Sequence, residues 1–129
     1  RSRESLDAKV METLAEFRIE ARADDLAGEL SHGEQQWLEI AMALAPGPRL
    51  LLLDEPTAGM SPEERRLTGD LLRPIKERCS MLIVEHDLDF IKDLSDVITV
   101  LDQGQVLDNG TPEQIETSER VREVYVTRV

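Results

Sequence analysis

The sequence predicts an α/β fold built on parallel strands. Two short apolar runs, Leu50–Leu53 and Met81–Val84, are bounded by breakers or polar residues, a pattern typical of strands buried on both faces of a sheet. An amphipathic helix separates them and begins at Ser61 and Pro62, a helix-capping serine followed by a first-turn proline. Strand, helix and strand within about 30 residues have the size of a parallel βαβ unit.

Two helices are predicted before the first strand. The segment from Ser5 to about Ala21 is amphipathic and is expected to cover a core. Its apolar face consists of Leu6, Val10, Leu14 and Phe17. The second helix starts at Ser31, where Ser31 and Glu34 fit a capping box that turns the Glu34 side chain back onto the helix start. Pro46, Gly47 and Pro48 end that helix.

The last third of the chain predicts a set of shorter elements. They are a helix over 87–94, two strands over 97–101 and 105–107, a helix from Thr111 and another over 119–125. Asp102, Gln103 and Gly104 join the two strands into a hairpin, which we expect at the edge of the parallel sheet.

Composition excludes several classes of protein. The net charge of −12 and a pI near 4.5 argue against nucleic acid binding, since phosphate backbones bind basic surfaces. The longest apolar runs are too short to cross a membrane, and no signal peptide is recognised. The single cysteine, Cys79, forbids an internal disulfide and fits a reducing cytosol.

Polar side chains follow both predicted strands. Asp54 and Glu55 come directly after the first apolar run, and His86 follows the second. In open α/β sheets, ligands bind beyond the carboxyl ends of the strands, so these side chains are expected to share one rim. Nucleotide hydrolysis needs one carboxylate for the Mg²⁺ shell and another to orient the attacking water. The alternative is that Asp54 and Glu55 form only a solvated strand exit.

Three segments together resemble the ATP-binding cassette (ABC) ATPases. LSHGEQQ resembles their signature motif, LLLLDEPTAGMS their Walker B segment and D-loop, and LIVEHD their switch-histidine segment. The order and spacing are similar to those of the second half of such a domain, over nearly the whole chain. Within the family, ELSHGEQQWLEIAMAL and RVREVYV resemble cassettes of branched-chain amino acid uptake, above all the urea-uptake branch.

The resemblance implies a fold and a set of site residues. The fold is the C-terminal half of a P-loop NTPase-type (RecA-like) parallel sheet core, residues 46–129, plus part of the ABC helical subdomain, residues 1–45. The implied catalytic residues are Glu55, the general base, and His86, which contacts the γ-phosphate. Asp54 is the implied Mg²⁺ ligand.

The resemblance also implies two segments that work across a dimer. The implied signature residues, which face the nucleotide of the partner subunit, are Ser31, His32, Gly33 and Glu34. The implied D-loop residues are Ala58, Gly59, Met60 and Ser61. A helix start with free N–H groups suits such an anion.

Three positions depart from the family pattern. His32 replaces a glycine, and we leave open whether it donates to phosphate or is a simple surface residue. Glu34 replaces a glutamine, and Ser61 replaces an aspartate, which removes any Asp-mediated contact across the dimer.

The sequence contains no G-x-x-x-x-G-K-[ST] loop, and its three lysines, Lys9, Lys76 and Lys92, do not follow glycine. We therefore expect a piece of a longer cassette that binds ATP weakly and does not hydrolyse it alone. Apolar strand surface without its neighbours also predicts self-association.

The leading hypothesis is the ATPase subunit of a bacterial importer of branched-chain amino acids or urea, working with ATP and Mg²⁺. Its implied partners are a second ATP-binding subunit, in a homo- or heterodimer, and transmembrane permease subunits. It is expected on the cytoplasmic side, without nucleic acid and without direct membrane insertion. The alternatives are a head-domain ATPase of the chromosome-maintenance or DNA-repair type and a non-catalytic regulatory cassette.

Overall fold

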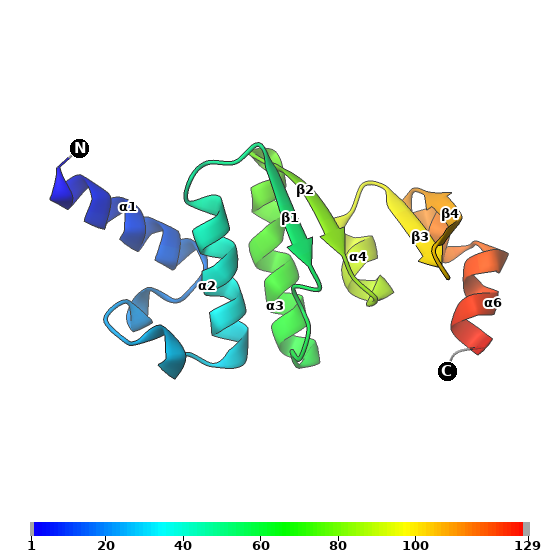
Figure 1. Ribbon diagram of the computed structural model, residues 1–129, viewed down its shortest axis with the longest axis horizontal. Helices are drawn as coiled ribbons and strands as arrows, with labels where there is room; N and C mark the ends of the chain where they lie inside the picture. The colour runs from blue at the N-terminus through cyan, green and yellow to red at the C-terminus, as the bar shows by residue number, and fades with distance from the viewer. Residues whose placement is uncertain (1, 128–129) are drawn as a thin grey trace. The chain divides into compact units, whose positions relative to one another are not determined.

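The computed structural model describes residues 2–127 (Figure 1). Within this range the chain divides into two compact units, 2–86 and 87–127. The regular elements of the first unit are α1 (Arg3–Glu16), α2 (His32–Leu44), β1 (Leu50–Asp54), α3 (Pro62–Leu72) and β2 (Ser80–Val84). Short 3-10 turns occupy Glu20–Arg22, Ala27–Glu29 and Arg73–Glu77. The predicted boundary between a helical subdomain and a core at residues 45 and 46 stays a prediction.

The two strands of the first unit confirm the predicted βαβ arrangement. β1 and β2 pair in parallel, from Leu50 opposite Ser80 to Asp54 opposite Val84, and α3 lies between them in the chain. Because both strands end at the same level, the residues that follow each strand meet at one edge. This register positions the candidate site.

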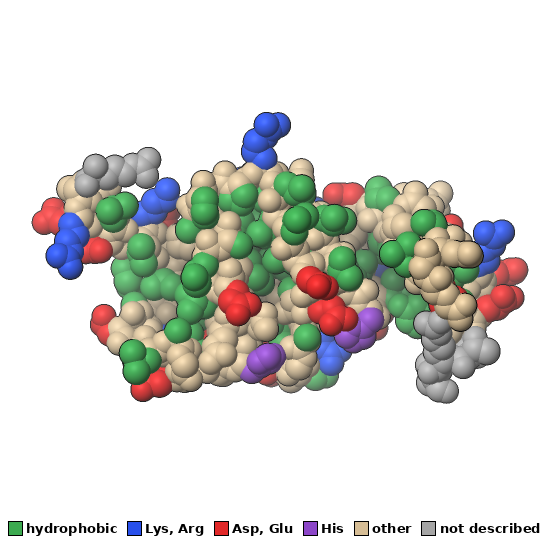
Figure 2. Space-filling view, in the orientation of Figure 1, with side chains coloured by type: hydrophobic (Ala, Val, Ile, Leu, Met, Phe, Trp, Pro, Cys, Tyr) green, Lys and Arg blue, Asp and Glu red, His purple; other side chains and the backbone are tan. Residues whose placement is uncertain are grey.

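The prediction that both faces of the sheet are buried is wrong. Strand alternation buries Leu51 and Leu53, which are at most 9% exposed. The other face carries Leu50, Leu52, Leu82 and Val84, which are 53–65% exposed. Figure 2 shows hydrophobic side chains over this sheet. No described residue packs on that face closely enough to bury it, so one side of the sheet remains open.

The first helix also differs from expectation. It ends at Glu16, because Arg18 adopts a left-handed conformation with φ 59° that stops the helix. The turn beyond it buries Phe17 and Ile19, whereas no residue of α1 itself is buried. Leu6 and Val10 are exposed, so α1 does not cover a core as predicted.

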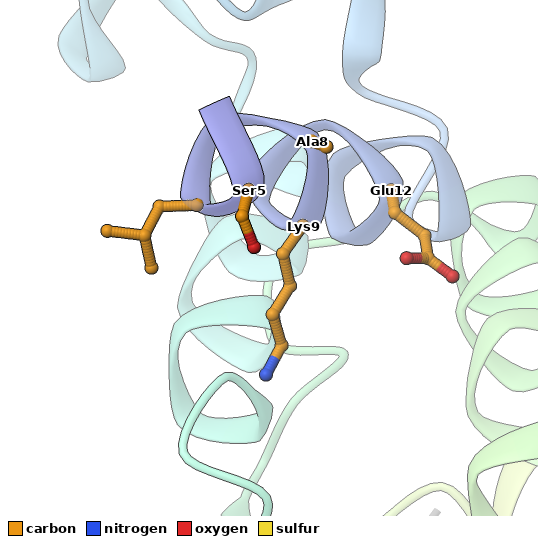
Figure 3. A pocket seen from close by; sticks show the side chains of 5 residues that line it. Ser5, Ala8, Lys9 and Glu12 are labelled. Atoms are coloured by element: carbon orange, nitrogen blue, oxygen red, sulfur yellow. The ribbon is translucent and has the colours of Figure 1, made fainter. Parts of the chain in front are cut away.

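A shallow hollow runs along this helix (Figure 3). All the residues that line the hollow come from one exposed helical segment. Ligand sites are concave pockets that bury most of the ligand, so this hollow is not a candidate ligand site.

A buried polar contact ties α2 to α3. The indole Nε1–H of Trp37 donates to Oγ1 of Thr68 at 2.9 Å. Trp37 is 8% exposed and Thr68 is completely buried. Thr68 in turn donates to the backbone carbonyl of Glu64 at 2.7 Å. The bond fixes the helix whose start carries the signature-like residues against the helix that follows the D-loop-like turn.

The second unit contains α4 (Leu88–Leu94), β3 (Ile98–Asp102), β4 (Gln105–Gly110), α5 (Pro112–Glu116) and α6 (Glu119–Thr127). The predicted hairpin is confirmed: β3 and β4 pair antiparallel through a turn in which Gln103 and Gly104 both have positive φ. Within the described chain, however, the two strands form their own sheet. The expected place of this hairpin at the edge of the parallel sheet stays a prediction.

Candidate functional site

The structure brings Glu55 and His86 together beyond the carboxyl ends of β1 and β2. The Nδ1 atom of His86 lies 3.3 Å from Oε1 of Glu55. Because an ionised carboxylate only accepts hydrogen bonds, Nδ1 is the donor in this contact. The N–H of Glu55 donates to the carbonyl of Val84 at 2.8 Å and so continues the parallel pairing past the strand ends.

Glu55 has an unusual backbone conformation. Its φ of 47° lies in the left-handed region, which a glutamate rarely occupies. Such conformations persist where the surrounding structure imposes them, and they concentrate at functional sites. The conformation lets the chain turn out of β1 immediately, and the Glu55 side chain stays half exposed at the rim.

Sequence reasoning missed a third member of this cluster, Glu85. Its side chain is fully buried. Oε1 accepts from the Thr57 N–H at 3.0 Å and from the Thr57 hydroxyl at 2.6 Å. Alternation along β2 was the available signal: Val84 is exposed, so the next residue points to the opposite, buried side.

The predicted D-loop residues form a compact turn before α3. The Ala58 N–H donates to the Glu55 carbonyl at 3.1 Å, and the Met60 N–H donates to the Thr57 carbonyl at 3.1 Å. Met60 is buried, so its side chain serves packing. Ser61 caps α3 as predicted, with its Oγ accepting from the Glu64 N–H at 3.1 Å.

His32 contacts this turn rather than standing alone on the surface. Its Nε2 lies 2.8 Å from the carbonyl oxygen of Ala58. Gly59 has a φ of 74°, and a Cβ there would come within 2.9 Å of the same nitrogen. A side chain at Gly59 would therefore displace the His32 ring and would also be strained by the positive φ. The signature-like helix start and the D-loop-like turn touch within one chain.

The start of α2 confirms the predicted capping box. The Glu34 N–H donates to Oγ of Ser31 and the Ser31 N–H donates to Oε1 of Glu34, both at 3.2 Å. Nη1 of Arg22 lies 3.5 Å from the same carboxylate. A hydrogen bond to Asp25, together with the charges of Asp25 and Glu34, raises the pKa of Arg22 above its ordinary value. The Glu34 side chain is thus turned back onto the start of its own helix, as predicted.

Gly33 is buried because another carboxylate lies over it. A Cβ at this position would meet Oε2 of Glu64 at 2.3 Å, so any larger residue would displace the Glu64 side chain. A carboxylate beside a helix N-terminus is electrostatically favourable. The backbone at Gly33 therefore lies close to a negatively charged group, the Glu64 carboxylate.

The role of magnesium ligand that the resemblance implies for Asp54 stays a prediction. Asp54 is the last residue of β1 and is exposed at the rim. Within residues 2–127 no group of three or more His, Cys, Asp or Glu side chains is placed to hold a metal ion. Mg²⁺ usually keeps several waters and binds one or two carboxylates together with substrate phosphates, so a single carboxylate suffices.

Comparison with known proteins places this arrangement in a family. A family profile described as "ABC transporter" matches residues 2–58. BraF, the high-affinity branched-chain amino acid transport ATP-binding protein of Pseudomonas aeruginosa, is 37% identical over 115 residues, which cover 88% of this chain and 45% of BraF. Residues 2–58 match the ABC transporter family, and 88% of the chain is similar to BraF.

Further relatives agree with this ABC assignment. LivG of Escherichia coli, a high-affinity branched-chain amino acid transport ATP-binding protein, is 38% identical over 81% of the chain and 42% of LivG. ArgV of Corynebacterium glutamicum, an arginine transport ATP-binding protein, is 38% identical over 84% of the chain and 43% of ArgV. The ABC chain thus spans less than half the length of these curated relatives.

Solved structures show the same fold. An ATP-binding cassette of an ABC transporter, determined in its ADP conformation, superposes with a TM-score of 0.83 at 27% identity, over 98% of this chain and 52% of the cassette. CbiO1 of Clostridium perfringens, part of the cbiONQ ABC transporter complex, gives 0.82 at 29% identity, over 98% of this chain and 51% of its own. The ABC domain therefore has the P-loop NTPase-type fold predicted from the sequence. Across residues 2–127, no helix is both long and apolar enough to span a bilayer.

Proposed function

We propose that the chain is the part of an ABC importer ATPase that supplies the catalytic carboxylate, the switch histidine and the signature residues. The observation that carries this proposal is the contact between Glu55 and His86, 3.3 Å apart at the edge where nucleotides bind in α/β sheets. A solvated strand exit needs neither a strained glutamate nor a histidine directed at it.

In the proposed reaction, water attacks the γ-phosphorus of ATP, the bond to the β,γ-bridging oxygen breaks, and ADP and phosphate leave. Glu55 accepts a hydrogen bond from that water and orients it for in-line attack. In the arrangement seen here His86 contacts the Glu55 carboxylate through Nδ1. Its Nε2 is proposed to face the phosphate. Asp54 would hold Mg²⁺, and the ion would neutralise phosphate charge.

The proposed partners follow from the two helix starts. Ser31, His32, Gly33 and Glu34 form an N-terminal helix turn that is proposed to face the nucleotide held by a second ATP-binding subunit. The turn of Ala58, Gly59, Met60 and Ser61 is proposed to lie along that same dimer contact. Permease subunits would then hold the assembly at the cytoplasmic face of the membrane.

Amino acids are the proposed solute class. Among the relatives, BraF and LivG are named for branched-chain amino acids and ArgV for arginine. In the proposed importer, the choice of solute rests with other subunits. Urea, the other solute predicted from the sequence, stays a prediction.

Turnover in a completed cassette tests the proposal. The chain is joined to the segment of BraF that lies outside the match, and MgATP hydrolysis is measured by phosphate release. Glu55→Gln keeps the size and removes the charge, so kcat is expected to fall by about 100- to 10,000-fold, the usual contribution of a general base. Glu63→Gln, which removes an exposed carboxylate from the first turn of α3, is the matched control and leaves turnover unchanged.

The isolated 129-residue chain provides a second arm. Calorimetry is expected to show no tight MgATP binding, since the sequence contains no phosphate-cradling G-x-x-x-x-G-K-[ST] loop. Equal turnover in Glu55→Gln and the parent cassette would refute the proposed role of Glu55 as the base. Micromolar MgATP affinity of the chain alone would refute the proposal that the main nucleotide-binding loop lies outside this chain.

A further inference from the structure

Glu85 has a buried oxygen that lacks a partner. Its side chain is fully buried, and Oε1 is satisfied by the two donors of Thr57. Oε2 has no hydrogen-bond partner in the structure. Leaving a buried carboxylate oxygen unsatisfied is costly, and native proteins rarely do so without a functional reason. A donor that comes within hydrogen-bond range of Oε2 would satisfy this oxygen.

His86 is the donor within reach. Its Nδ1 lies 3.9 Å from Oε2 of Glu85 and 3.3 Å from Oε1 of Glu55. The His86 side chain is 76% exposed. A displacement of about 1 Å brings Nδ1 into normal hydrogen-bond range of Oε2. Two carboxylates thus flank the same ring nitrogen.

We propose that Glu85 is a positioning residue that takes over the Nδ1–H hydrogen bond of His86 from Glu55. The hydrogen stays on Nδ1 throughout, and only its acceptor changes. In the arrangement seen here, Oε1 of Glu55 is occupied by His86. After the exchange, that oxygen is available to accept from the attacking water. This consequence rests on the proposed function of Glu55.

The same carboxylate connects the exchange to the D-loop-like turn. Oε1 of Glu85 holds the N–H and the hydroxyl of Thr57, so the position of the turn sets the position of Oε2. On its other side, the turn is held by the contact between His32 and the Ala58 carbonyl. A movement of this turn therefore changes the acceptor offered to His86.

The tautomer of His86 provides a test that does not depend on ATP turnover. Nitrogen-15 NMR of the labelled chain at mildly alkaline pH reports which ring nitrogen carries the hydrogen, and His32→Asn assigns the signals of the two histidines. Glu55→Gly removes the first acceptor while tolerating the positive φ. We expect His86 to keep its hydrogen on Nδ1 in this variant, because Glu85 accepts it.

The double variant Glu55→Gly with Glu85→Gln is the matched comparison. The glutamine carbonyl still accepts from both donors of Thr57, so its amino group faces His86 as a donor. We expect the hydrogen to move to Nε2. Thr57→Val on the Glu55→Gly background keeps the Glu85 carboxylate and is expected to keep the hydrogen on Nδ1.

Turnover in the completed cassette is the second readout. Glu85→Gln alone is expected to lower kcat roughly 10- to 100-fold, the range of a charge-assisted hydrogen bond, with KM for MgATP within about twofold. If Glu85→Gln instead raised KM for MgATP and left kcat unchanged, Glu85 would act in ground-state binding and not in positioning.

The two readouts separate the inference from the proposed function. Loss of the Nδ1 hydrogen in Glu55→Gly alone overturns the exchange, even where Glu85→Gln fails to fold. An inactive parent cassette overturns the proposed function, while retention of the hydrogen on Nδ1 in Glu55→Gly still supports Glu85 as its acceptor.

Discussion

The bond between Trp37 and Thr68 yields a prediction whose size follows from the structure. Thr68→Val replaces the completely buried hydroxyl by a methyl group of similar volume. The indole N–H of Trp37, 8% exposed, then has no acceptor in place of an Oγ1 at 2.9 Å. A buried donor left unsatisfied costs about 1–3 kcal/mol of unfolding free energy. Threonine and valine have similar helix propensities, so that term changes little.

Tryptophan fluorescence measures this loss selectively. Trp37 is the sole tryptophan of the chain and lies in the first unit, so its emission follows the unfolding of residues 2–86. With a urea m-value of about 2 kcal/mol/M, the midpoint is expected to fall by about 0.5–1.5 M. Thr68→Ser keeps the hydroxyl, so its urea midpoint is expected to fall less than that of Thr68→Val.

Thr13→Val is the control for this experiment. Thr13 donates to the carbonyl of Lys9 at 3.0 Å, which is the same bond to the preceding turn that Thr68 makes to Glu64. It lacks the tryptophan partner, so only the helical back-bond is lost. If Thr68→Val and Thr13→Val shift the midpoint equally, the indole bond contributes nothing and the reasoning fails.

Three further predictions concern titration and the open sheet face. Hydrogen bonds from the Ser118 hydroxyl and the Asn109 N–H hold the pKa of Asp108 below its ordinary value, so its stabilisation is present above the unfolded-state pKa and is lost as pH falls through the folded one. Asp108→Asn should make the loss of folding stability at acid pH, measured by circular dichroism, less steep. An unchanged pH dependence would show that Asp108 does not contribute to it. Burial, followed by the charges of Asp87 and Asp89, raises the pKa of Tyr125 above 10.0. Folding stability is therefore lost as pH rises through the folded-state pKa. In Asp89→Asn, the tyrosinate absorbance should appear at lower pH than in the parent chain. A Tyr125 titration at the ordinary value would contradict this. Leu52→Lys, on the exposed face of β1, should abolish concentration-dependent association of the chain in light scattering, and a wild-type chain that stays monomeric would refute the attribution.

Much of the local structure was predictable from neighbouring residues. The capping box of Ser31 and Glu34, the cap at Ser61 and the two parallel strands follow from patterns a few residues long. The meeting of Glu55 and His86 also follows, because parallel strands joined by one helix end at the same edge. The roles of these residues in hydrolysis stay proposals.

Only the tertiary structure decided which side chains lie against one another across long stretches of chain. His32 meets Ala58 26 residues away, and Glu85 meets Thr57 28 residues away. It also left Leu52 exposed, where its apolar run alone predicted burial. Periodicity records which face a residue occupies, but burial and pairing depend on what packs against that face. The sequence therefore determined the residues at the rim, and packing determined the acceptors between which His86 lies.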